Sequence, residues 1–374
     1  MDARRTPQLF ALLWFMGFAA ALAFEPPHFR PFELLRTEGP VFRPGQRVEM
    51  DAYGALAYRY PGVVGPAVRP NTFTTDRSGL RNPPMGWPRV VVVGDSFVAG
   101  VGLSDDETLP QVLSRRLGEP VYNYGAQLQY GPRHYLGDPR FSQQSPGVVV
   151  VMPSESSLAP LDLPGAPGPA GGDGRRHVRL GPPTPFAAWD ALATEVLSIN
   201  VLLNRDNGLA RWARGVYHPL RAIVLGHPNE VVVDGAPALV ADLDEQRLTR
   251  PVTQAQLAPL VESYVAVVRA VEARGSRVLV APIPAMGSVY PELFPEADRA
   301  RVVSPSLLQA LLAALAAQGV ATLDLLPAFV AHKTPYLYLR DDTHWDAPGV
   351  AVTAEAVEAA LVSRGWTRTG TTAR

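Results

Sequence analysis

The chain of 374 residues contains no cysteine, and Lys333 is its single lysine. Without cysteine there can be no disulfide bond, no thiolate metal site and no cysteine nucleophile. Acidic and basic residues nearly balance, at a formal net charge of -1, so no basic surface suggests a nucleic-acid partner. The histidines show neither an i, i+4 pair nor another metal-ligand spacing. We therefore expect no metal, no cofactor and no bound nucleic acid.

Long hydrophobic runs are also scarce, and the one that matters lies near the amino terminus. Two arginines precede an apolar stretch at residues 9–24. As a helix this stretch would span only about 24 Å, which is less than the ~30 Å hydrocarbon core of a membrane. It ends in an Ala-Leu-Ala pattern typical of signal-peptide cleavage sites. The sequence therefore predicts a signal peptide or membrane anchor at residues 1–24 and export to the periplasm or the exterior, with membrane contact only through residues 8–24.

Residues 25–88 are rich in proline, glycine and aromatic residues, which argues against long helices. Short β segments fit this composition better, for example at residues 55–60. Residues 71–82 indicate an ordered turn just before the first core strand. We predict a β-rich N-terminal extension for this part of the chain.

Residues 89–363 alternate short apolar runs with helical patterns. The expected strands are residues 90–93, 120–124, 148–152, 277–281 and 320–325, and the expected helices are residues 108–117, 186–212, 254–274, 306–318 and 348–361. The sequence also indicates a loop insertion at about residues 158–185 and a tail at residues 364–374, and it gives no assignment for residues 216–249. This alternation predicts an α/β domain with a parallel sheet of about five strands, covered by helices on both faces.

Two motifs follow predicted strands and carry reactive side chains. Gly94-Asp95-Ser96-Phe97 comes directly after the first core strand, and Asp341-Asp342-Thr343-His344-Trp345 comes after the last one. In a parallel sheet, ligands bind beyond the carboxyl ends of the strands, so both motifs map to the same rim. Alone, the first could be a turn with a helix cap, and the second a loop histidine or half a metal site. Together they predict a nucleophile, Ser96, activated by His344 and an aspartate.

This combination resembles the SGNH (GDSL-like) hydrolase superfamily over about residues 71–363. Gly94–Phe97 match its first block, and the spacing of Asp341 and His344 matches its last block, Asp-x-x-His. The Asp-Thr-His-Trp sequence at residues 342–345 is also similar to the alginate O-acetyltransferase-like branch, where the aspartate lies two before the histidine. In that branch the motif precedes the serine, whereas here the serine comes first. The resemblance implies a three-layer flavodoxin-like fold, with Asp341 or Asp342 orienting the imidazole.

The family also implies where an oxyanion would bind. Its second block supplies a backbone N–H, here that of Gly125, beside that of Ser96, although a plain turn glycine fits equally well. The asparagine of the third block is missing, and Ser154 follows the corresponding strand. Losing one oxyanion donor typically costs about 3–4 kcal/mol of transition-state stabilisation. Either Ser154 or Asn123 substitutes for the missing asparagine, or turnover is slow, or the acceptor chemistry differs.

Trp345 follows the histidine directly and has two readings. As an exposed ring it would stack on a sugar, and as a buried ring it would belong to the core. No residue in the sequence decides between them. Asn123 is also expected to contact the substrate.

The sequence thus predicts an exported serine-dependent esterase or O-acyltransferase. Its substrate would be an acylated, in particular acetylated, carbohydrate of the cell envelope or of a secreted polysaccharide, or another small ester. Resolution of the acyl-serine by water or by a sugar hydroxyl stays open, as does the oligomeric state. The alternatives are a non-catalytic glycan-binding or assembly protein on the same fold, and a lipase-like esterase with an apolar acyl tunnel.

Overall fold

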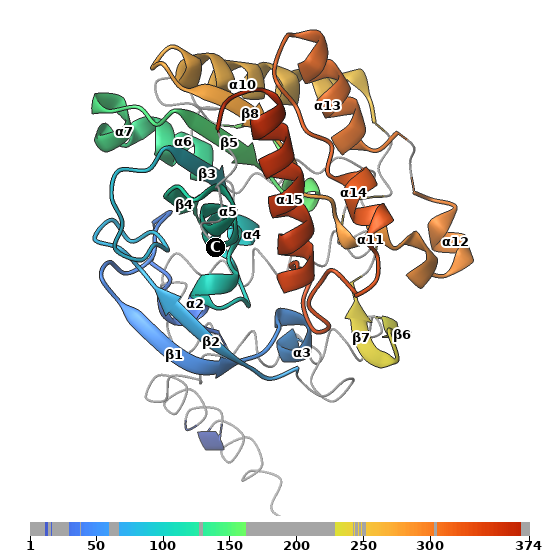
Figure 1. Ribbon diagram of the computed structural model, residues 1–374. Coiled ribbons are helices and arrows are strands. Elements are labelled where there is room, and N and C mark those ends of the chain that lie inside the picture. The colour runs from blue at the N-terminus through green and yellow to red at the C-terminus, as the bar shows by residue number, and fades with distance from the viewer. Residues whose placement is uncertain are drawn as a thin grey trace, which may run out of the picture. The chain divides into compact units, whose positions relative to one another are not determined.

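The structure is a computed structural model (Figure 1). It describes residues 12–13, 16, 30–37, 39–59, 67–126, 130–161, 229–241, 243, 246, 248, 252–302 and 305–367. The elements below belong to a compact unit made of Phe29–Tyr58, Val64–Arg176 and Pro228–Arg374. The predicted helix at 186–212, most of the predicted loop insertion and most of residues 1–24 lie outside the described residues. Within the described part of the chain, no helix is both long enough and apolar enough to cross a membrane.

The centre of this unit is a parallel sheet of four strands in the order β4-β3-β5-β8. Their bounds are β3 (Val90–Gly94), β4 (Val121–Gly125), β5 (Val148–Met152) and β8 (Arg277–Val280). The first three are buried along their whole length, as the continuous valine runs of β3 and β5 indicate. The α/β fold class with a parallel sheet, predicted from the sequence, is confirmed.

The fifth strand, expected at residues 320–325, is reduced to a single bridge between Thr322 and Val280. Two hydrogen bonds of 2.9 Å join this segment to Val280. The N–H of Val280 donates to the Ala321 carbonyl, and the N–H of Leu323 donates to the Val280 carbonyl. The pairing stops there because Asp324 accepts a hydrogen bond from the N–H of Leu326, where helix α14 (Leu326–Ala331) begins. The chain therefore turns into a helix before a strand can form.

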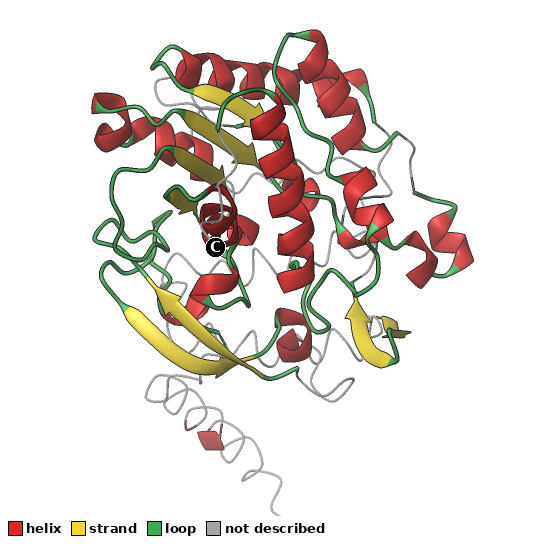
Figure 2. Cartoon of the chain, viewed as in Figure 1, coloured by secondary structure: helices red, strands yellow, loops and turns green. Residues whose placement is uncertain are grey.

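Helices cover both faces of the sheet, because successive side chains of a strand point to opposite sides. Val90 and Val92 pack in the core with α5 (Leu109–Leu117) and α15 (Ala347–Ser363). Val91 and Val93 pack in a second core with α6 (Tyr130–Gly137), α10 (Gln254–Glu272) and α13 (Leu307–Ala317). Figure 2 shows the strands between these helices, which gives the three layers that the sequence predicts.

The helix boundaries follow from capping residues in the sequence. Ser306 and Gln309 form a capping box at the start of α13, and Thr253 opens α10 in the same way. Helix α5 begins after Thr108, which places Pro110 in the first turn, where its missing N–H costs little. The remaining short helices are α4 (Ser96–Ala99), η1 (Asp105–Glu107), α7 (Pro139–Gln143), η2 (Glu155–Ser157), α11 (Met286–Val289), η4 (Pro291–Leu293) and α12 (Glu296–Arg299).

The N-terminal extension contains an antiparallel pair, β1 (Arg47–Ala52) and β2 (Arg69–Thr74), and the short helix α2 (Pro31–Leu34). The strand expected at residues 55–60 is wrong, because Ala55–Arg59 form a helix, α3. Alanine and leucine favour helices, and the first N–H groups of α3 find acceptors in a distant loop. Ala55 donates to the Asp342 carboxylate at 2.7 Å, and Leu56 donates to the Asp341 carbonyl at 3.0 Å.

A second hairpin lies within residues 216–249, where the sequence pattern predicts no element. Its strands are β6 (Asn229–Val233) and β7 (Ala236–Val240). Asp234 and Gly235 between them both have positive φ, at 50° and 73°, as a two-residue type I′ turn requires. An Asp-Gly pair flanked by apolar residues is a hairpin signal, so the sequence did contain the information needed.

Arg81 fastens the extension to the main sheet. Its buried guanidinium donates to the Gly100 and Leu103 carbonyls, both at 2.6 Å, in the loop after α4. It also donates to Thr72 of β2 at 2.6 Å and pairs with Asp105 at 2.9 Å. The loop behind Ser96 is thereby held from the N-terminal side of the chain.

The central strand should tolerate truncation much less than the hairpin at residues 229–240. Val92 is fully buried in β3, and Val232 on β6 is 72% exposed. Val92→Ala should lower the free energy of unfolding by about 2 kcal/mol through lost burial and the cavity left behind. Val232→Ala is the matched control and should change it by less than about 0.5 kcal/mol. Chemical denaturation measures both values, and equal losses would contradict this packing.

Candidate active site

Ser96 stands where β3 ends and α4 begins, at the carboxyl edge of the sheet. Asp95 caps this helix, and its carboxylate accepts a 3.0 Å hydrogen bond from the N–H of Phe97. The helix ends after one turn at Gly100, whose φ of 77° suits glycine. This strand-turn-helix geometry presents the serine hydroxyl beyond the strand end.

His344 lies in a tight loop closed by main-chain hydrogen bonds. The N–H of Leu339 donates to the His344 carbonyl at 2.9 Å, and that of Asp342 donates to the Leu339 carbonyl at 3.3 Å. Asp346 then caps α15 by accepting from the N–H of Ala347 at 2.8 Å. The loop is thus fixed on both sides, and it carries the aspartate and the histidine on one turn of chain.

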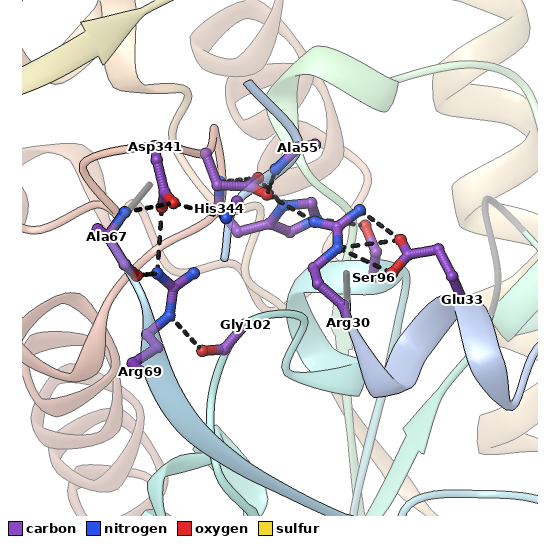
Figure 3. A network of polar contacts seen from close by, with 11 residues as sticks. Arg30, Glu33, Ala55, Ala67, Arg69, Ser96, Gly102, Asp341 and His344 are labelled. Carbon is purple, nitrogen blue, oxygen red and sulfur yellow. Dashed lines mark hydrogen bonds and ion pairs between the residues drawn. The ribbon is translucent and has the colours of Figure 1, made fainter. Parts of the chain in front are cut away.

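The structure brings Ser96 and His344 together, although 248 positions separate them (Figure 3). His344 Nε2 lies 2.8 Å from Ser96 Oγ, and His344 Nδ1 lies 2.6 Å from Asp342 Oδ1. The Phe97 ring packs against the imidazole with centroids 4.6 Å apart. Both the serine and the histidine are half-buried, so a substrate can reach them. The arrangement lets the hydroxyl pass its proton to the ring while the aspartate fixes the tautomer.

The two aspartates of the loop have different contacts. Asp342 touches the imidazole, at the spacing of two residues before the histidine. Asp341 instead accepts from the N–H of Gly54 at 2.6 Å and from Arg69 Nη1 at 3.1 Å. Gly54 approaches so closely that a Cβ there would lie 2.0 Å from the Asp341 carbonyl oxygen. Asp341 therefore anchors the N-terminal extension and does not contact the histidine.

Asp342 is a buried carboxylate with several partners. Arg30 Nη1 donates to Oδ2 at 2.5 Å, and the N–H of Ala55 donates to the same oxygen at 2.7 Å. Burial alone would raise the pKa of Asp342, but the Arg30 charge and then His344 outweigh it. The pKa of this carboxyl is therefore held well below its ordinary value. Neither Arg30 nor Ala55 belongs to a recognisable motif, so sequence reasoning missed both.

The residues expected around an oxyanion lie differently from the prediction. Gly125 ends β4, and its N–H is already donated to the Asn123 side chain at 2.8 Å. Asn123 is fully buried, and its amide nitrogen donates to the Val98 carbonyl at 3.0 Å. The predicted substrate-binding role of Asn123 does not fit this burial, because its polar groups hold neighbouring main chain.

Ser154 is also committed to a structural contact. Its hydroxyl donates to Asp95 Oδ2 at 2.6 Å, and its N–H lies 3.3 Å from the same oxygen. Burial raises the pKa of Asp95, in spite of these hydrogen bonds. Ser96 is the first residue of α4, and first-turn N–H groups have no acceptor within their own helix.

Trp345 is fully buried and meets Phe97 edge-to-face, with ring centroids 5.5 Å apart. Of the two readings that the sequence left open, the core aromatic fits, and stacking on a sugar does not. The Phe97 ring lies between the Trp345 ring and the imidazole and contacts both. In the described part of the chain, no three His, Asp or Glu side chains are grouped as they would be to hold a metal.

The parallel α/β sheet and the serine, histidine and aspartate at its edge resemble the SGNH hydrolase type, and a family model supports this resemblance over part of the chain. Residues 243–373 match the family model described as the SGNH hydrolase-like domain of acetyltransferase AlgX. This region contains Asp342 and His344 and leaves Ser96 outside. The resemblance to the SGNH superfamily and its alginate O-acetyltransferase-like branch is confirmed.

Individual relatives are distant. The chain is 32% identical over 96 residues to a "Probable alginate O-acetylase AlgJ" from Pseudomonas syringae pv. tomato. That match covers 25% of this chain and only 24% of the relative's length. Among solved structures, TesA is similar at 14% identity and a TM-score of 0.36, over 73% of this chain and 97% of that one. A lipolytic protein of the G-D-S-L family from Desulfitobacterium hafniense is similar at 13% identity and a TM-score of 0.36, over 73% and 98% of the two chains.

The stabilising effect of Asp342 should depend on pH. Its pKa is lower in the folded protein than the ~3.9 of an unfolded chain, so it stabilises the fold above about pH 4. Below that pH the unfolded chain binds a proton first, and this contribution falls by about 1.4 kcal/mol per pH unit. Asp342→Asn should cost about 3 kcal/mol at pH 7, the lower end for a broken buried ion pair, because Glu33 remains beside Arg30. Urea denaturation should show a smaller difference in the free energy of unfolding between the wild type and Asp342→Asn at pH 3 than at pH 7. An equal difference at both pH values would contradict this role of Asp342.

Proposed function

We propose that this protein is an exported serine-dependent enzyme that removes or transfers acyl groups, in particular acetyl, on a polysaccharide. One observation carries the proposal: His344 lies between Ser96 Oγ at 2.8 Å and Asp342 Oδ1 at 2.6 Å. This is the chain of contacts that activates a serine hydroxyl. The partly exposed position of both reacting side chains supports it.

The first half-reaction forms an acyl-serine. His344 Nε2 takes the proton of Ser96 as Oγ attacks the ester carbonyl, and the N–H of Ser96 stabilises the oxyanion. The ester C–O bond then breaks, and the imidazolium returns the proton to the departing alcohol. Asp342 holds Nδ1 protonated and stabilises the imidazolium throughout.

The second half-reaction releases the acyl group. Water or a sugar hydroxyl gives its proton to His344 and attacks the carbonyl carbon of the acyl-serine. The bond between that carbon and Ser96 Oγ then breaks, the imidazolium returns the proton to Oγ, and the carboxylic acid or the new sugar ester leaves. Water makes the protein an esterase, and a sugar hydroxyl makes it an O-acyltransferase. A sugar as the acceptor is supported by the names of the matched family and relative, an acetyltransferase and an alginate O-acetylase.

Export and the type of substrate are part of the proposal. The charged and apolar pattern of residues 1–24 favours a periplasmic or extracellular site of action. Polysaccharides of the envelope or secreted polysaccharides are acetylated substrates or acceptors available there. We propose such a glycan as the partner, with membrane contact only through residues 8–24.

One observation favours a second function, a glycan-binding or assembly protein without catalysis. The N–H groups of Gly125 and Ser154 are donated to side chains, so neither is open to an oxyanion in this conformation. A protein of this kind would keep the fold and the site's shape without an activated serine.

A fluorophosphonate probe separates the two functions. An activated serine reacts with it covalently, so the enzyme should be labelled at Ser96, as peptide mass spectrometry would show. Ser96→Ala should remove both the labelling and the release of acetate from an aryl acetate. Ser157→Ala, which alters the last serine of η2, is the control and should be labelled like the wild type. If the wild-type protein is not labelled, the enzyme proposal is contradicted and the glycan-binding or assembly function is favoured.

The two neighbouring aspartates should differ in their effect on the rate. Asp342→Asn should lower kcat for an aryl acetate by about 10³–10⁴, because it favours the wrong imidazole tautomer. Asp341→Asn leaves the imidazole contact intact, so its reduction in kcat should be at least about tenfold smaller than that of Asp342→Asn. Circular dichroism spectra of both variants check that they are folded. A greater loss in the Asp341 variant would rule out the assignment of Asp342.

A further inference from the structure

Arg30 reaches the site from the start of the N-terminal extension. It lies just before α2, and 312 positions separate it from Asp342. Only 9% of its side chain is exposed, and Nη1 lies 2.5 Å from Asp342 Oδ2. Figure 3 shows Arg30 beside Glu33 and close to the site of Ser96 and His344. An arginine buried against the aspartate of a Ser-His-Asp chain is a charged group that the reaction steps above do not use.

Arg30 and His344 share one carboxylate. Oδ1 of Asp342 accepts from the imidazole side, and Oδ2 accepts from Arg30 and from the N–H of Ala55. Both oxygens are therefore held, which prevents the carboxylate from rotating away from the ring. The carboxylate charge that would stabilise an imidazolium is at the same time partly neutralised by the guanidinium.

Glu33 holds Arg30 in turn. It accepts from Arg30 Nε at 2.9 Å and from Nη2 at 2.5 Å, and its own side chain is 23% exposed. A continuous line of contacts thus runs from Glu33 through Arg30, Asp342 and His344 to Ser96. The charges along this line alternate in sign up to the imidazole.

We propose that Arg30 is a positioning residue that, through Asp342, tunes how readily His344 accepts the proton of Ser96. The inference rests on the proposed function, since it concerns the same serine. A positive charge behind Asp342 weakens the attraction between that carboxylate and an imidazolium, so Arg30 acts on the step in which the ring takes the serine proton. Removing the guanidinium would shift the rise of reactivity to higher pH.

Two other carboxyl groups also face this site, and each has hydrogen-bond or ion-pair partners. Asp95 on the turn before α4 lies near His344 and is hydrogen-bonded by Ser154. Asp341, on the same loop as His344, pairs with Arg69 of β2 at 3.1 Å. Among the residues that the structure describes, Arg30 is the guanidinium bonded directly to Asp342.

The test is the pH dependence of fluorophosphonate labelling at Ser96, followed as a second-order rate from pH 5 to pH 9. Arg30→Met should move the midpoint of this profile up by about one pH unit, which is the size expected for losing one nearby charge. Labelling should then be about tenfold slower on the acid side and approach the wild-type rate at high pH. Arg30→Lys keeps the charge and should restore most of the wild-type midpoint.

Glu33→Gln gives a second test that keeps Arg30 in place. Without the Glu33 charge the guanidinium is less neutralised, so the midpoint should fall by about 0.3 pH units, a small shift because Glu33 is partly exposed. Arg47→Met is the control, because Arg47 pairs with Glu49 on the exposed face of β1, where both side chains are more than 60% exposed. Its profile should coincide with that of the wild type.

The outcomes separate the inference from the function on which it rests. A wild-type protein that is not labelled overturns the proposed function itself. Two outcomes overturn the role of Arg30 and leave the proposed function standing, provided that the wild type is labelled. In one, the midpoint of the pH profile of Arg30→Met is unmoved. In the other, Arg30→Met is labelled more slowly by the same factor at every pH. If Arg30→Met does not fold, an unchanged or raised midpoint in Glu33→Gln overturns it instead.

Discussion

The burial of one carboxylate, that of Asp342, governs how the site is built. A buried charge without partners is very unfavourable, so each of its oxygens must find a donor. The imidazole of His344 supplies one, and Arg30 with the N–H of Ala55 supplies the others. The N-terminal extension is therefore not an appendage to the α/β unit. Arg30 and the first turn of α3 supply donors to Asp342, the carboxylate that contacts His344.

The parallel sheet explains why side chains so distant in sequence meet. The carboxyl ends of parallel strands share one edge, and the chain turns there from strand to helix. Ser96 comes directly after β3, and the loop of His344 lies just before α15, which packs on the same face as α5. Tight packing then fixes the geometry, because Phe97 lies against the imidazole and against the buried ring of Trp345.

The site departs from the family pattern at the oxyanion positions. Where an asparagine is usual, Ser154 donates its hydroxyl to Asp95, and Asn123 takes the N–H of Gly125. Both contacts stiffen the strand ends around Ser96, yet they use donors that a transition state would need. An oxyanion formed at Ser96 would therefore find fewer free main-chain donors than the family pattern supplies, whether water or a sugar hydroxyl is the acceptor.

The sequence by itself determined the three-layer fold, most element boundaries and the pair Ser96 and His344. Continuous valine runs, capping residues and short motifs carry this information locally, within a few positions. It also contained an Asp-Gly turn signal for β6 and β7. Only the tertiary structure decided between Asp341 and Asp342, turned residues 55–59 into a helix and brought Arg30 to the site. Each of these depends on which partner a buried polar group finds across the fold, and that partner lies hundreds of positions away, where no local pattern marks it.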